Sequence, residues 1–250
     1  MIWITGDCHR NFEKFNPSNF PEQADMTKDD YIIICGDFGG VWDENSEGME
    51  ETMLLDWMDC KPYTTLFVSG NHENFDRLKG YPVEEWNGGK IQKIRPSVLH
   101  LMRGQAFVLE GKTFFTFGGA KSHDMVCVLD REDPDFRKKK RELKREWIPY
   151  RTNHVDWWQE ELPTTEEMEE GLRNLEIHDW NVDYIVTHCC SSSTQAMIGD
   201  ETFKSDLLTD YFEKVKQNTV YKKWYFGHYH MDQELFGCEN VLCDKIIRII

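Results

Sequence analysis

The 250-residue sequence has no apolar run approaching the ~18 to 20 residues of a membrane-spanning helix. It has no internal repeat, and no segment rich enough in glycine, proline or serine to divide the chain. Its first residues turn polar early and lack the basic start and apolar middle of a signal peptide. These absences predict a single cytoplasmic domain over residues 1–250 that does not associate with a membrane.

Basic residues are in the minority, with 29 Lys and Arg against 45 Asp and Glu, which gives a net charge of −16. A field of this sign repels polyanions and argues against general binding of duplex nucleic acid. The segment from Arg137 to Arg145 is an exception, because it is almost entirely basic. Two explanations stay open: a solvated helix face, or a flexible basic arm that gathers a polyanionic substrate or partner.

Disulfide bonds are not expected, because the 8 cysteines are scattered along a chain that has no export signal. Cys8, Cys189 and Cys190 are interpreted as small buried hydrophobic residues. The sequence is 40% hydrophobic and 13% aromatic, so it can bury a sizeable core. We therefore expect a compact fold without covalent cross-links.

Five short apolar runs predict strands that are buried on both faces. They span residues 2–5, 31–35, 65–69, 184–187 and 223–226. Strands that alternate with helices indicate an α/β domain.

Helical periodicity appears between these runs. Apolar residues recur at helical spacing in residues 49–58 and 207–215, where they are expected to face the core, and Ser205 is the expected cap of the second helix. Thr164 opens a capping-box pattern at the start of another helix. Residues 91–117 instead resemble consecutive hairpin strands, which predicts a second, partly antiparallel sheet.

Polar metal-binding side chains follow each predicted strand. These residues are Asp7, His9, Asp37, Asn71, His188, His228 and His230. Any one cluster alone is more often a surface turn than a metal site. Because loops at the carboxyl ends of strands converge on ligands in open α/β sheets, their joint recurrence predicts one shared site.

These donors suit manganese, iron or zinc, and they exceed what one ion needs. Two divalent ions that share a carboxylate would use all of them, and we favour manganese. Such a pair would leave a positive centre in an acidic protein, which would attract a phosphate ester.

The order Asp-x-His, Gly-Asp, Gly-Asn-His-Glu, a lone His and Gly-His-x-His, from Asp7 to His230, resembles the calcineurin-like metallophosphoesterase family. The resemblance implies two packed mixed β-sheets flanked by helices in a four-layer sandwich. It implies one metal on Asp7, His9, Asp37 and His230, and a second on Asp37, Asn71, His188 and His228.

The resemblance further implies hydrolysis of a phosphomonoester or phosphodiester by metal-activated hydroxide, with His72 as general acid. Gly40 departs from the pattern, because many members have an aspartate there that orients this histidine. Asp43 or Asp76 could replace it, or His72 could only bind phosphate. A non-catalytic metal-binding scaffold is the alternative function, although the full donor set favours an enzyme.

Residues 121–163 are expected to form an insertion at the substrate rim. This part is similar to a bacterial and phage subgroup of small metallophosphoesterases. His123 and Arg151 are candidate substrate contacts because of their position, whereas Trp157 and Trp158 are interpreted as core aromatics that anchor the loop. The sequence indicates neither the ester that is cleaved nor the oligomeric state.

Overall fold

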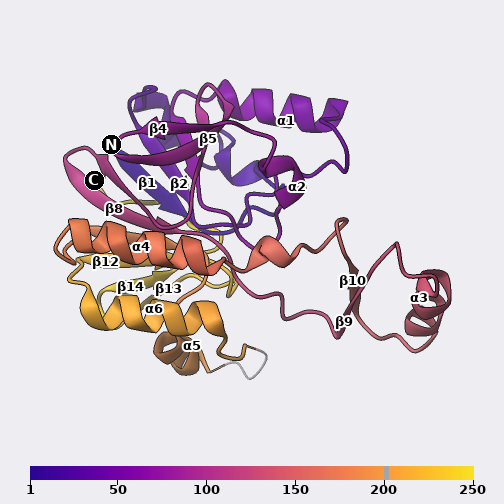
Figure 1. Ribbon diagram of the computed structural model, residues 1–250. Helices are drawn as coiled ribbons and strands as arrows, with labels where there is room; N and C mark the ends of the chain where they lie inside the picture. Colours follow the sequence, from indigo (N-terminus) through magenta and orange to yellow (C-terminus); the bar gives the residue numbers. More distant parts are fainter. Residues whose placement is uncertain (200–202) are drawn as a thin grey trace.

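The computed structural model describes residues 1–199 and 203–250 and consists of two large β-sheets with helices on their outer faces (Figure 1). The strands of the first sheet are β1 (Ile2–Thr5), β2 (Tyr31–Ile34), β3 (Thr64–Phe67), β4 (Val83–Trp86), β5 (Gly89–Arg95), β6 (Val98–Leu101) and β15 (Ile247–Arg248). The second sheet contains β7 (Gln105–Leu109), β8 (Lys112–Phe117), β11 (Tyr184–Thr187), β12 (Lys223–Phe226), β13 (Gln233–Leu235) and β14 (Glu239–Val241).

Both sheets are mixed, as predicted. The first has the order β15-β1-β2-β3-β6-β5-β4, and the second the order β13-β14-β12-β11-β8-β7. The central strands of each sheet are parallel, and antiparallel strands lie toward the edges. The hairpins expected in residues 91–117 are present, but they are divided between the two sheets.

The two sheets pack face to face over an apolar core, and each outer face is covered by helices. Side chains between the sheets include Ile4, Ile33, Leu66, Phe114 and Val186, all fully buried. The helices are α1 (Met49–Asp59) and α2 (Phe75–Leu78) near the first sheet, and α4 (Thr165–Ile177), α5 (Ser192–Ile198) and α6 (Leu207–Asn218) near the second (Figure 1). This confirms the four-layer α/β sandwich.

Three details of the helix predictions are wrong. Met49 and Met53 are 80% and 66% exposed, because α1 turns Leu55 and Met58 toward the sheet instead. Leu207, at the start of α6, is 61% exposed. The cap of α6 is Asp206 rather than Ser205, since the Asp206 carboxylate accepts the free backbone N–H groups of the first turn. The capping box at Thr164 is confirmed.

Residues 121–163 include an arm that extends from one end of the sandwich (Figure 1). A parallel strand pair, β9 (Cys127–Leu129) and β10 (Tyr150–Thr152), forms its stem, and α3 (Phe136–Arg145) lies at its tip. Among the described helices, none combines the length and apolar character needed to cross a bilayer.

Candidate metal centre

The carboxyl ends of five parallel strands deliver all the predicted donor residues to one place. β1 leads to Asp7 and His9, β2 to Asp37, β3 to Asn71 and His72, β11 to His188, and β12 to His228 and His230. The two sheets meet at this end, because His228 N–H, after β12 of the second sheet, donates to the carboxylate of Asp7, after β1 of the first sheet. Strands from different sheets therefore share one site.

The first group of donors surrounds the imidazole of His9. Its Nε2 lies 3.1 Å from His230 Nε2 and 3.6 Å from Asp37 Oδ2. His230 Nε2 in turn lies 3.4 Å from Asp7 Oδ2. The side chains of Asp7 and Asp37 are buried, whereas the His230 side chain is 60% exposed, so this group opens to solvent on one side.

The second group surrounds the buried imidazole of His188. Its Nε2 lies 3.1 Å from Asn71 Oδ1 and 3.3 Å from Asp37 Oδ1. His188 Nδ1 lies 2.8 Å from the Cys35 carbonyl oxygen and donates to it, which leaves the Nε2 lone pair directed at the other donors. The His228 ring packs 5.0 Å from the His188 ring, centroid to centroid. Asp37 has one oxygen toward each group.

These separations fit divalent cations. Around one ion with bonds of ~2.0 to 2.2 Å, neighbouring ligands lie about 3.0 to 3.5 Å apart. The contacts of His9 with His230 and of His188 with Asn71 and Asp37 fall in that range. Buried atoms with lone pairs directed at a common point repel one another unless a cation or proton lies between them.

Positive charge is favoured at His188, whereas burial lowers the pKa of His9 to about 4 and holds that of His228 well below its usual value. Burial lowers the pKa of His188, but the carboxylates of Asp37 and Asp7 outweigh it and raise this pKa to about 9. Burial acts to raise the pKa of Asp37, yet His188 and the other histidines hold it below its usual range. Burial raises the pKa of Asp7 to about 6. The site therefore stabilises a cation beside Asp37.

His72 lies beside the first group of donors. Its ring is 5.1 Å from the His9 ring, and one of its nitrogens is within 4.8 Å of donor atoms of His9 and Asp37. The backbone N–H of His72 donates to Asp37 Oδ1 at 2.8 Å, which ties the two loops together. Burial lowers the pKa of His72, although Asp37 opposes this shift.

Position 40 has no room for an aspartate side chain. A Cβ on Gly40 would lie 2.3 Å from the ring of Phe38, which stacks on Phe67. Within residues 1–199 and 203–250, neither Asp43 nor Asp76 forms a hydrogen bond or ion pair with His72. Asp43 accepts from Arg10 and from Gly48 N–H.

Asp76 instead binds the side chains of His154 and Trp158. The acidic residue that acts on His72 besides Asp37 is Asp124, whose charge raises the pKa of the imidazole. The expectation that Asp43 or Asp76 orients His72 is therefore wrong, because both carboxylates hold other parts of the structure.

The residues that support the donor loops were not assigned a role from the sequence. The buried carboxylate of Glu73 accepts from Phe38 N–H at 2.8 Å and from Gly39 N–H at 3.2 Å, which holds the loop that carries Asp37. Asn71 Nδ2 donates to Ser122 Oγ, which donates to Glu161 at 2.6 Å. Glu73 belongs to the Gly-Asn-His-Glu motif, but no local pattern links Ser122 to Glu161.

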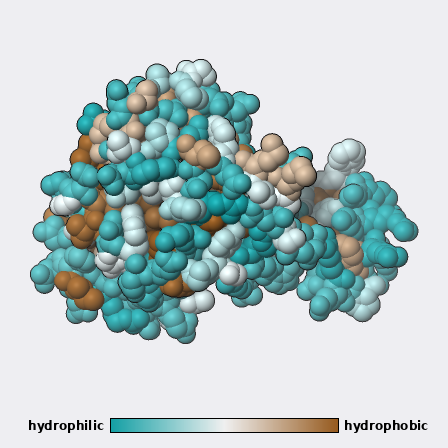
Figure 2. Space-filling model, turned by 90° about the horizontal axis from the view of Figure 1, so that it is seen from above, coloured by the Kyte–Doolittle hydropathy of each residue, from teal (hydrophilic) through white to brown (hydrophobic). Residues whose placement is uncertain are grey.

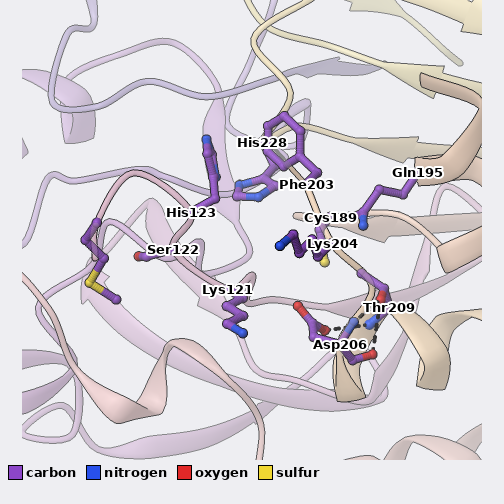
Figure 3. A pocket seen from close by; sticks show the side chains of 11 residues that line it. Lys121, Ser122, His123, Cys189, Gln195, Phe203, Lys204, Asp206, Thr209 and His228 are labelled. Atoms are coloured by element: carbon purple, nitrogen blue, oxygen red, sulfur yellow. Dashed lines mark hydrogen bonds between the residues drawn. The ribbon is translucent and has the colours of Figure 1, made fainter. Parts of the chain in front are cut away.

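A cavity of about 250 Å³ opens beside the second group of donors (Figure 3). His228, His123 and Phe203 form part of its wall. The ring centroids of His123 and Phe203 lie 4.2 Å apart. Lys121 and Lys204 also line the cavity. It therefore offers an aromatic wall and two positive charges next to the candidate metal centre.

Of the other residues singled out from the sequence, Arg151 lies beside the site, whereas Trp158 and the three cysteines are buried. Arg151, on β10, forms an ion pair with Asp124, and its charge lowers the pKa of His72, which places it on the His72 side of the site. Trp158 is 1% exposed and packs in the core as expected, whereas Trp157 is only partly buried. Cys8, Cys189 and Cys190 are buried, free thiols, as predicted.

Gly70→Ala should disrupt the centre. A Cβ at this position would lie 1.9 Å from Asp37 Oδ1 and 2.4 Å from Asp37 N, so the loop carrying Asp37 would have to move. We expect manganese affinity, measured by calorimetric titration, to fall at least about tenfold. Gly80→Ala is the control, because its nearest atom is the Arg77 carbonyl oxygen at 3.2 Å. Equal affinities in the two variants would contradict the close approach.

A two-sheet α/β sandwich with clustered histidines and carboxylates at its strand ends has the architecture of a metal-dependent hydrolase. The family model for calcineurin-like phosphoesterases matches residues 1–232. The chain belongs to the calcineurin-like phosphoesterase family.

Two individual proteins are also similar. Lariat debranching enzyme A from Xenopus laevis is 26% identical over 136 residues, which is 49% of this chain and 24% of that protein. The match thus spans about a quarter of the relative's length. The crystal structure of phosphopantetheinyl hydrolase from Mycobacterium tuberculosis has a TM-score of 0.44 and 14% identity, covering 97% of this chain and 89% of that one.

Proposed function

We propose that this chain is a cytoplasmic phosphoesterase that uses two divalent metal ions, with manganese favoured, to hydrolyse phosphomonoesters or phosphodiesters. The proposal rests on the convergence of donor atoms from five strand ends into two adjacent groups that share Asp37. The first ion would be held by Asp7, His9, Asp37 and His230, and the second by Asp37, Asn71, His188 and His228. The chemistry that such ions supply is activation of water and neutralisation of charge on the phosphoryl oxygens.

The chain's own residues would bind the ester and manage its proton. His72 would donate a proton to the departing oxygen, because its imidazole lies at the edge of the donor cluster. Arg151 and His123 would contact the phosphate from opposite sides, since one lies near His72 and the other near His228. The cavity lined by Lys121 lies on the His228 side, so it would hold the substituent of a diester that stays on the phosphorus.

The direct test is metal-dependent hydrolysis of two model substrates, p-nitrophenyl phosphate and bis(p-nitrophenyl) phosphate. Chain stripped with a chelator should be inactive and should regain turnover with about two equivalents of manganese. The ratio of kcat/KM for the two substrates would then decide between a monoester and a diester. Two bound manganese ions without turnover of either substrate would support the scaffold function and contradict the proposal.

Lys121→Ala should weaken binding of a phosphodiester whose retained substituent carries negative charge. Lys121 lines the cavity beside His228, so its charge would act on that substituent. We expect KM to rise about tenfold, which equals ~1.4 kcal/mol of lost binding, with little change for an uncharged substituent. Lys112→Ala is a matched control, because Lys112 lies at the opposite end of β8. Unchanged KM values for the charged ester would argue against this use of the cavity.

A further inference from the structure

The insertion ends in a basic helix that takes no part in the core. α3 (Phe136–Arg145) has no buried residue. Figure 1 shows the helix at the tip of the arm, and Figure 2 shows the arm as a largely hydrophilic lobe that projects from the body. Its lysines and arginines therefore do not stabilise either sheet, and their concentration here has no structural explanation in the fold.

Most of the positive charge lies on one side of this helix. At 3.6 residues per turn, six basic side chains fall within an arc of about 160°. They are Arg137, Lys138, Lys140, Arg141, Lys144 and Arg145. Lys139 projects to the other side, where it forms an ion pair with Asp133. Within residues 1–199 and 203–250, no ion pair involves Arg137, Lys138, Arg141 or Lys144.

An exposed aromatic ring adjoins this basic face. Trp147 follows the end of α3 and is 91% exposed, although the chain has an ample core in which to bury an indole. Lys140 Nζ lies 5.3 Å from the Phe136 ring centroid and 5.9 Å from that of Tyr150, so two further aromatic rings lie close to a basic side chain of the arm. Rows of positive charge with accessible rings are typical of surfaces that bind single-stranded nucleic acid.

We propose that the basic face of α3 together with Trp147 binds single-stranded nucleic acid, with backbone phosphates on the basic side chains and a base stacked on the indole. A duplex keeps its base faces covered, so it would use the charge but not Trp147. The acidic remainder of the chain repels the same ligand, which confines binding to the arm.

The test is fluorescence anisotropy of labelled oligo(dT) and oligo(U), each about 20 nucleotides long, with the full, metal-loaded chain and gel analysis to verify that each probe stays intact. The variant Arg137→Gln/Lys138→Gln/Arg141→Gln/Lys144→Gln should bind at least about tenfold more weakly, and the slope of log Kd against log salt should fall by about 3. Trp147→Ala should weaken binding about tenfold with no change in that slope. The two probes also show whether ribose or deoxyribose is preferred.

The control variant removes four basic residues from the body instead: Lys112→Gln, Lys214→Gln, Lys245→Gln and Arg248→Gln. It makes the same change in net charge and should leave Kd within about twofold. Equal losses in the two variants, or no binding by the natural chain at low salt, would overturn the proposal. Tight binding of duplex that Trp147→Ala does not weaken would also overturn it. So would sedimentation that shows a dimer dissociated only by the arm variant, because the basic face would then contact a second copy of the chain.

Discussion

Asp37→Asn should lower the hydrolysis of phosphate esters by more than about a hundredfold and reduce bound manganese from two ions per chain to about one. The two oxygens of Asp37 lie 3.6 Å from His9 Nε2 and 3.3 Å from His188 Nε2, so this carboxylate faces both groups of donors. Asparagine keeps the shape, but it is neutral and presents an N–H donor toward one group. Metal analysis and kcat, measured on the same preparation, provide the check.

Two further variants separate metal binding from folding. Asp29→Asn changes an exposed aspartate and should leave both activity and metal content unchanged. His230→Asn changes a side chain that is 60% exposed, so it should reduce metal content without loss of the core. Full activity in Asp37→Asn or His230→Asn would show that the donor groups do not hold the catalytic ions.

The sequence predicted the donor cluster well because parallel strands impose a common direction. Once residues 2–5 and 31–35 were identified as buried strands, the polar residues after them were expected at one edge of a sheet. The packing of the two sheets then brings the residue after 184–187 to the same place. The inference used only residue type, order and the short length of each run. The large number of residues between Asp7 and His230 therefore played no part in the inference.

Contacts that depend on packing between distant segments could not be predicted in this way. Asn71 is supported by Ser122 and Glu161, and no periodicity links residues so far apart. The exposed side of α1 was misassigned because Met53 is as hydrophobic as Met58, and only the position of the sheet decides which is buried. The strands of the arm, with 3 residues each, are too short to produce a strand pattern.

His72→Asn should impair hydrolysis selectively, according to the leaving group. If His72 protonates the departing oxygen, an alkyl phosphate should react about 10² to 10⁴ times more slowly, because its alkoxide is a poor leaving group. A p-nitrophenyl ester should lose less than about tenfold, since its phenolate departs without a proton. Burial lowers the pKa of His72, and the negative charge of a bound phosphate would act to raise it. The measurement is kcat for both esters at equal manganese occupancy.

Metal content distinguishes this role from direct ligation, because His72 also lies within 4.8 Å of donor atoms of His9 and Asp37. If His72 were a metal ligand, His72→Asn would lose manganese and would lose activity equally toward both esters. Asp124→Asn gives an independent comparison, since Asp124 raises the pKa of His72 while Arg151 lowers it. If Asp124 supports His72 in place of the aspartate that position 40 lacks, Asp124→Asn should slow hydrolysis of the alkyl ester more than hydrolysis of the p-nitrophenyl ester. An equal effect on both would limit Asp124 to holding Arg151 through their ion pair.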